Sequence, residues 1–489
     1  MRDLKERTLR GGLAKVCSQG ANFFLRLASL VVLARLLDPT DFGLVGMVTA
    51  VTGVFSLFRD AGLSMATVQR TTISDEEVST LFWLNMAVGA ILGGLSLAVA
   101  PILVSFYQEP RLFLVTAALG TGFLFNAAGV QHSALLQREM RFVTLSVIET
   151  IALLISIAVG IGMALGGYGY WALVGMAVSL PAVSTICLWS LGTWVPGMPR
   201  RGAEIGSMVR FGSTATLNSL VVYVAYNLEK VLLGRFWGTE ALGMYGRAYQ
   251  LVSIPTENLN SATGGVLFAA LSRLQNEPDR FKKYFLRSYA LVLSLTLPIA
   301  VACALFADDI ILLVLGSKWQ DAVPIFRLLT PTILVFALIN PMYWLLVSIG
   351  LVGRSMKLAL VVAPLVITAY ILGLPYGPRG VAFAYSAALV LWVVPHIAWC
   401  IHGTMISSRD LLETVGRPLL STIVAAAFAY LAGLVYGESL TPIVRLSFGG
   451  SILVMVYLWM LLFVMGQKEL YLDLVRGMKS RPDLTGAVG

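Results

Sequence analysis

The chain has 489 residues, of which 57% are hydrophobic and only 12% are Asp, Glu, Lys or Arg. This balance excludes a soluble globular protein and indicates a polytopic membrane protein in a lipid bilayer. The net charge of +9 therefore does not indicate nucleic-acid binding, because basic residues of a membrane protein gather in the loops on one side. The four cysteines lie singly within apolar segments, so we predict no disulfide framework, no metal site and no cofactor.

Apolar segments long enough to cross a bilayer follow one another with short connections. The basic N-terminus resembles the start of a signal peptide, but the first apolar segment is too long for one and contains Arg26, so we predict no cleavable signal. The lengths predict an all-α fold of about fourteen transmembrane helices, near residues 13–37, 42–64, 80–107, 112–134, 142–166, 168–192, 208–234, 241–271, 284–307, 322–349, 356–375, 380–403, 417–436 and 443–466.

The orientation follows from the basic residues between these segments. If the N-terminus is cytoplasmic, the loops on that side carry about five times as many Lys and Arg as the loops on the other side. An even number of spans then places both termini in the cytoplasm. We therefore expect a multi-pass membrane protein.

Two local patterns recur in the same order about 200 residues apart. Residues 38–46 and 238–246 both read as a turn, an acidic residue and a Gly-x-x-Gly that opens a helix, and residues 167–172 are echoed by 377–382. The repeat predicts two six-helix lobes of parallel topology, at residues 1–200 and 201–405. Two additional helices in residues 406–466 and a cytoplasmic tail at 467–489 would complete the chain.

The first span carries a polar stripe at helical spacing, formed by Lys15, Gln19, Asn22, Arg26 and Ser29. An Arg side chain that faces lipid at mid-depth costs about 2.5–3.5 kcal/mol on insertion scales. The stripe therefore predicts a wet cavity that binds an anionic head group. The alternative is that Arg26 has a structural role, paired with a buried carboxylate such as Glu149 or Glu257.

Similar stripes occur in the second, seventh and eighth spans, which predicts a central cavity between the two halves. Ionised groups within a membrane are functional by default. The candidate cavity residues are Lys15, Gln19, Asn22, Arg26, Arg59, Tyr223, Asn227, Lys230, Gln250, Glu257 and Asn260. Candidates for coupling to an ion gradient are Glu149, Glu229 and Glu257, although each could equally be a salt-bridge partner of Arg26 or Lys230.

Catalysis finds no support in the sequence. There is no Gly-x-x-x-x-Gly-Lys-Ser/Thr phosphate loop, the loops are short, and the three histidines are dispersed without metal-ligand spacing. We therefore expect a transporter and not an enzyme.

Residues 33–47 resemble the signature between the first and second spans of bacterial polysaccharide flippases, and residues 60–70, 79–85 and 268–275 resemble its continuation. The family is the polysaccharide transporter branch of the multidrug/oligosaccharidyl-lipid/polysaccharide (MOP) flippase superfamily, and the resemblance is closest to colanic-acid and teichuronic-acid exporters. It implies a two-lobe fold of fourteen helices. It also implies that an undecaprenyl-diphosphate-linked oligosaccharide moves from the inner to the outer leaflet of the bacterial cytoplasmic (inner) membrane, for exopolysaccharide or lipopolysaccharide synthesis.

The polar stripes and the family resemblance together lead to one hypothesis. Arg26, Arg59 and Lys15 would pair with the diphosphate, and the sugar would lie among Asn22, Tyr223, Tyr226, Asn227, Gln250 and Asn260. H+ or Na+ as coupling ion, and a polysaccharide polymerase or export machinery as partner, are further expectations. Three alternatives remain: a cation-coupled multidrug exporter of the same superfamily, a membrane polysaccharide polymerase or glycosyltransferase, and a peptidoglycan-precursor flippase.

Overall fold

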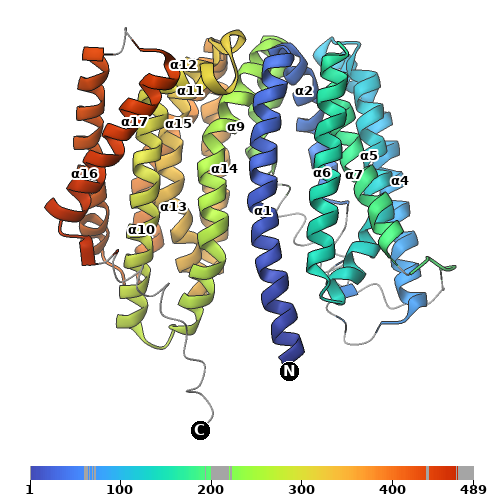
Figure 1. Ribbon diagram of the computed structural model, residues 1–489, viewed down its shortest axis with the longest axis horizontal. Coiled ribbons are helices and arrows are strands. Elements are labelled where there is room, and N and C mark those ends of the chain that lie inside the picture. The colour runs from blue at the N-terminus through green and yellow to red at the C-terminus, as the bar shows by residue number, and fades with distance from the viewer. Residues whose placement is uncertain are drawn as a thin grey trace. The chain divides into compact units, whose positions relative to one another are not determined.

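The computed structural model describes residues 2–59, 64, 67, 68, 70, 73–192, 194–199, 220, 223–436, 440–469 and 471 (Figure 1). Side chains are described from Lys15 onward, apart from those of residues 16, 259, 261–263, 266 and 436. In these residues the regular structure is helical and contains no strand, which confirms the all-α prediction. The helices are α1 (Arg2–Leu36), α2 (Pro39–Ser56), α4 (Asp75–Tyr107), α5 (Leu112–Arg138), α6 (Phe142–Leu165), α7 (Trp171–Leu191), α9 (Leu228–Arg273), α10 (Pro278–Leu305), α11 (Ala307–Val314), α12 (Ala322–Leu329), α13 (Pro331–Ser348), α14 (Val352–Gly373), α15 (Gly377–Ile401), α16 (Ser408–Tyr436) and α17 (Pro442–Trp459).

Ten helical segments among the described residues are long and apolar enough to cross a membrane. One of them, Val352–Ile401, contains both α14 and α15. Polar residues interrupt the apolar runs of α2 and α9, which lie outside this set. The helices follow the predicted spans in order, and the spans predicted at 42–64 and 208–234 extend in part beyond the described residues. The chain is therefore a multi-pass membrane protein.

Local sequence explains where several helices begin. Pro39 opens α2, and the backbone N–H of Asp38 donates to Oδ2 of Asp41 at 3.1 Å. Ser74 and Glu77 form a reciprocal capping box at the start of α4. Gly238, at φ 82° and ψ −173°, breaks α9 into two segments because these dihedral angles are not helical. A positive φ strains residues with a side chain, which explains the glycine at this position.

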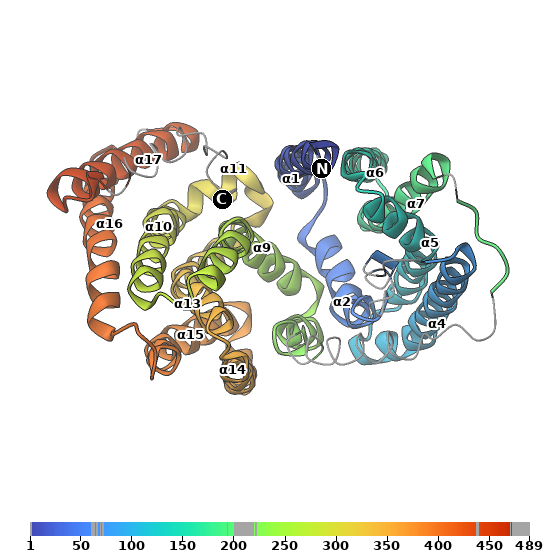
Figure 2. The ribbon, with the colours of Figure 1, turned by 90° about the horizontal axis from the view of Figure 1, so that it is seen from below.

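Contacts divide the chain into two compact units. The first comprises residues 1–246 with 314–319 and 374–378. In it, α1 lies beside α6, and α5 lies between α4 and α7 (Figure 2). The Oγ atom of Ser18 lies 3.1 Å from Oγ1 of Thr150 and so joins α1 to α6. The indole of Trp319 donates to the Ala34 carbonyl at 2.8 Å, so the short 314–319 segment is fastened to α1.

The second unit comprises residues 247–313, 320–373 and 379–489. Its core forms around α10, whose Phe281, Phe285 and Tyr289 are fully buried. The last two helices share an apolar cluster that includes Ala429 of α16 and Leu453 of α17. An ion pair joins Arg445 of α17 to Asp309 of α11, with Arg445 Nε at 2.8 Å from Asp309 Oδ2. Large apolar side chains remain exposed on both units, as expected for surfaces that face lipid.

The boundary between these units falls within α9, after Gly246. The predicted division into residues 1–200, 201–405 and 406–466 stays a prediction. Of the tail at 467–489, residues 470 and 472–489 lie outside the described part of the chain.

The repeated Gly-x-x-Gly segments of α2 and α9 cross at very close range. A Cβ atom on Gly43 would lie 1.7 Å from the carbonyl oxygen of Thr239. A Cβ atom on Gly243 would lie 1.9 Å from the carbonyl oxygen of Pro39. The contact is therefore reciprocal: each copy of the motif meets the start of the other copy. Only glycine allows two helix backbones to approach this closely.

Candidate substrate-binding cavities

The first unit contains a cavity of about 430 Å³ within the bundle. Five elements contribute to its walls, namely α1, α2 with the residues that follow it, α5, α6 and α7. Its polar and charged lining consists of Asn22, Arg26, Thr49, Thr52, Ser56, Arg59, Asn126, Glu149 and Ser184. The polar stripes of the first and second spans thus meet in one cavity.

Three ionisable side chains line this cavity: Arg26 on α1, Arg59 just after α2, and Glu149 on α6. None of the three side chains has a hydrogen bond or ion pair among the residues that the structure describes. The alternative of a structural ion pair between Arg26 and Glu149 is therefore absent from this conformation. The cavity carries two positive charges against one negative charge, and all three are available to a ligand.

Amide groups add to this polar surface. The Oδ1 atoms of Asn22 and Asn126 are buried and have no hydrogen-bond partner among the described residues. Buried polar atoms without partners in the protein normally bind water or a ligand. By contrast, the hydroxyls of Thr49 and Thr52 donate to backbone carbonyls of their own helix, at 3.2 and 2.9 Å.

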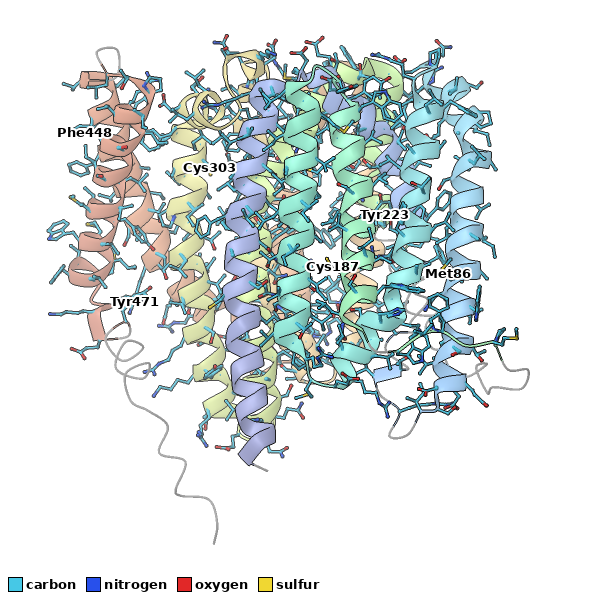
Figure 3. All side chains as sticks on the ribbon, turned by 45° about the vertical axis from the view of Figure 1, so that its right-hand side comes forward. Met86, Cys187, Tyr223, Cys303, Phe448 and Tyr471 are labelled. Atoms are coloured by element: carbon cyan, nitrogen blue, oxygen red, sulfur yellow. The ribbon has the colours of Figure 1, made fainter. Side chains whose placement is uncertain are left out.

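Other candidates from the sequence lie elsewhere. Lys15 and Gln19 are exposed on α1 and do not line the cavity, because α1 extends beyond it. The Tyr223 hydroxyl lies 3.1 and 3.2 Å from the carbonyl oxygens of Thr49 and Ala50 (Figure 3). It occupies space left open by Gly53, where a Cβ would lie 1.9 Å from it. Tyr223 thus joins the segment that precedes α9 to α2.

Asn227 and Lys230 bind each other, with Lys230 Nζ donating to Asn227 Oδ1 at 2.7 Å. Glu229 between them is fully buried, and neither of its carboxylate oxygens has a hydrogen-bond partner in the described part of the chain. These three residues line neither of the cavities described here. The predicted cavity between the two halves stays a prediction.

The second unit contains its own cavity of about 200 Å³. Helix α9 supplies Tyr249, Val252, Ser253, Thr256, Glu257 and Asn260, and α13 supplies Thr332, Phe336 and Asn340. The sequence had indicated Glu257 and Asn260. It missed the α13 residues, for which the available signal was a single Asn in the middle of an apolar span. Gln250 is exposed and accepts a hydrogen bond from Arg247 instead.

Comparison with known proteins identifies a family and several relatives of this chain. Residues 32–324 match the family described as polysaccharide biosynthesis protein. The lipopolysaccharide biosynthesis protein WzxC of Escherichia coli K12 is 27% identical over 377 residues, or 76% of each chain. The teichuronic acid biosynthesis protein TuaB of Bacillus subtilis 168 is 28% identical over 65% of this chain and 66% of its own. The succinoglycan biosynthesis transport protein ExoT of Rhizobium meliloti 1021 is 24% identical over 64% of each chain.

Solved structures show the same fold. The lipid II flippase MurJ, in an inward closed conformation, aligns with a TM-score of 0.74 over 96% of this chain and all of its own, at 14% identity. A multidrug resistance MATE transporter of the MOP superfamily, in its inward-facing conformation, aligns with a TM-score of 0.62 over 78% of this chain and 94% of its own, at 15% identity. The family match covers more than half of the chain, and the chain therefore belongs to the polysaccharide biosynthesis protein family.

Proposed function

We propose that this protein flips an undecaprenyl-diphosphate-linked oligosaccharide from the inner to the outer leaflet of the cytoplasmic membrane, for exopolysaccharide or lipopolysaccharide synthesis. The observation that carries the proposal is the cavity of the first unit, in which the side chains of Arg26 and Arg59 have no partner among the residues that the structure describes. Two unpaired arginines inside a membrane bundle require an anionic ligand or water to offset the loss of hydration.

A diphosphate fits this chemistry. The planar guanidinium group of Arg donates two parallel hydrogen bonds to phosphate oxygens, which a Lys ammonium cannot do. Asn22 and Asn126 add amide groups beside the two arginines, in reach of bridging oxygens or the first sugar. The polyprenyl chain would remain in lipid while the head group crosses within the bundle. The arginines disfavour the alternative of a multidrug exporter for cationic compounds, because like charges repel.

Three carboxylates are candidates for coupling to H+ or Na+. Glu149 faces the arginines within the cavity, so binding of a cation to Glu149 would leave the arginines as the uncompensated charge and strengthen their hold on the diphosphate. Glu229 is buried without a partner, and Glu257 lines the second cavity. Alternating access by rocking of the two lobes, cytoplasmic termini, and delivery to a polysaccharide polymerase or export machinery complete the proposal.

The test is complementation of a bacterial strain that lacks its own polysaccharide flippase, with Arg26→Ala, Arg26→Lys and Arg59→Ala. Truncating one member of a buried charge contact costs about 2–5 kcal/mol of binding, or roughly 30-fold to several thousand-fold in affinity. We expect surface polysaccharide to fall and lipid-linked oligosaccharide to accumulate inside at unchanged protein level. Arg26→Lys should restore export only in part.

Arg409→Ala is the matched control. The Arg409 side chain is 88% exposed on α16 and pairs only with Glu413, one turn away. This variant should export normally. Normal export by both Arg26 variants and by Arg59→Ala would show that the cationic cavity does not serve the cargo, and the proposed function would lose its basis.

A further inference from the structure

The cavity of the second unit occupies the place in the repeat that the cationic cavity occupies in the first. The pairs Thr49 and Tyr249, Thr52 and Val252, and Ser56 and Thr256 line the two cavities at the offset that separates Gly43 from Gly243. The opposing helices also correspond, since α5 supplies Phe123 and Asn126 while α13 supplies Phe336 and Asn340. The fold has thus formed the same kind of cavity twice.

The charge of the two cavities is opposite. No Lys, Arg or His lines the second cavity, and its one ionisable acidic side chain is Glu257. The Glu257 carboxylate has no hydrogen bond or ion pair within the part of the chain that the structure describes. A carboxylate without a neighbouring cation repels phosphate. The occupant of the second cavity is therefore a different part of the cargo from its diphosphate.

The remaining side chains match the surface of a sugar ring. Asn260, Asn340 and Glu257 offer amide donors and carbonyl or carboxylate acceptors, and the buried Thr256 Oγ1 has no partner. Trp344 Nε1 donates to Asn260 Oδ1 at 3.4 Å, which leaves the amide nitrogen of Asn260 as a donor for a ligand. Tyr249 and Phe336 add aromatic surface, on which the C–H face of a pyranose can stack.

Size separates a sugar from an ion. The volume of 200 Å³ is about that of six or seven water molecules at roughly 30 Å³ each, which is the space that one pyranose ring needs. A bare monovalent cation would require oxygens to converge at about 2.4 Å around a far smaller site.

We propose that this second cavity is a saccharide subsite that takes one pyranose unit, with Glu257, Asn260 and Asn340 as hydrogen-bonding groups and Tyr249 and Phe336 as stacking surface. The inference rests on the proposed function for the origin of the sugar, but its ligand is distinct from the diphosphate. It adds α13 to the elements that select the cargo.

The test uses the full chain in lipid nanodiscs in sodium-free buffer. Titration calorimetry measures binding of the methyl pyranosides of glucose, galactose, N-acetylglucosamine, fucose and glucuronic acid. We expect at least one glycoside to bind with a millimolar Kd, and Asn340→Ala and Glu257→Gln each to weaken it about tenfold, which corresponds to about 1.4 kcal/mol. Asn258→Ala, on the same helix but outside the lining, is the matched control and should leave binding unchanged.

A second probe, farnesyl diphosphate, keeps this inference apart from the proposed function. Arg26→Ala should weaken the binding of farnesyl diphosphate and leave the binding of the glycoside unchanged. Asn340→Ala should weaken glycoside binding and leave the binding of farnesyl diphosphate unchanged, which also shows that the variant is folded. Absence of glycoside binding, or binding insensitive to both substitutions, overturns the subsite. Saturable Na+ binding that Glu257→Gln abolishes, without any glycoside binding, reassigns the cavity to a cation. If the glycoside binds and farnesyl diphosphate does not, the result counts against the cationic cavity and leaves the saccharide subsite standing.

Discussion

Replacing Gly243 with Ala should separate α2 from α9 where their backbones cross. The added methyl carbon would lie 1.9 Å from the carbonyl oxygen of Pro39 and 3.2 Å from the backbone nitrogen of Gly43. A carbon atom approaches a carbonyl oxygen to about 3.3 Å at closest, so the helices must move apart by roughly 1.4 Å. Both nearest groups are backbone, so no side-chain rotation can relieve the overlap. Overpacking of this kind costs about 1–3 kcal/mol and occasionally more.

Gly246→Ala provides the control within the same helix. No atom lies within 4 Å of the position that its Cβ would take, so the substitution should be neutral or stabilise by up to about 1 kcal/mol, because alanine loses less backbone entropy on folding. The assay is the temperature at which half of the detergent-solubilised, fluorescently tagged protein aggregates. The aggregation midpoint of Gly243→Ala should lie well below the midpoints of both the unsubstituted protein and Gly246→Ala. Equal midpoints for the two variants would refute the close crossing of these helices.

Three further predictions concern the ends of the helices. Arg445→Met removes the ion-pair partner of the buried Asp309 carboxylate, so the free energy of unfolding should fall by about 3–5 kcal/mol. Adding Asp309→Leu should recover most of the loss in melting midpoint. An equal loss in the single and double variants would contradict this prediction. The Arg111 side chain, by hydrogen bonding, lowers the pKa of the Glu109 carboxyl, so their stabilisation is present above the ordinary carboxyl pKa and disappears as pH falls through the lowered value. Glu109→Gln should therefore lower the free energy of unfolding by at most about 1 kcal/mol at neutral pH, since the pair is partly exposed. The loss should vanish in acid, and a loss of stability that grows in acid would contradict the prediction. In a cysteine-free background, Met198→Cys, at a residue 91% exposed, should react with an impermeant maleimide only in opened cells and Glu109→Cys in intact cells; labelling of both from one side would refute the orientation.

Much of the fold follows from segment length and turn chemistry. Apolar length alone separates most of the membrane helices, and the glycine before Thr239 marks the break in α9. The predicted span at 322–349 divides into α12 and α13, which was not predicted. The division occurs at Pro331, which cannot donate a backbone hydrogen bond to the preceding turn. The short helix α11 was likewise missed, because its eight residues are too few to cross a bilayer and carry Asp308 and Asp309 in the first turn.

The candidate cavities were predictable only in part. Asn22, Arg26 and Arg59 share a cavity because helical spacing places polar groups on one face. Spacing does not say where a cavity ends, so Lys15 and Gln19 were included although they lie beyond it. A lone Asn126 or Asn340 in an apolar span creates no periodicity, and these residues become visible only when helices pack.

Tyr223 shows a different limit of the sequence. Its polar hydroxyl suggested a ligand contact, yet it lies beside two backbone carbonyls of α2 in space opened by Gly53. Such a pairing depends on residues that are far apart in the chain. No local pattern around either residue reveals it.

The reciprocal crossing of residues 39–46 with 239–246 is an isologous contact, in which each half offers the other the same surface. Two separate copies of a half-length chain could form this contact as a symmetric dimer. Such a dimer would be bound to carry identical residues in both of its cavities. Within one chain, each half can change independently, so Arg59 can line one cavity and Glu257 the other. Joining the two copies of the motif in one chain thus permits the two cavities to differ in charge.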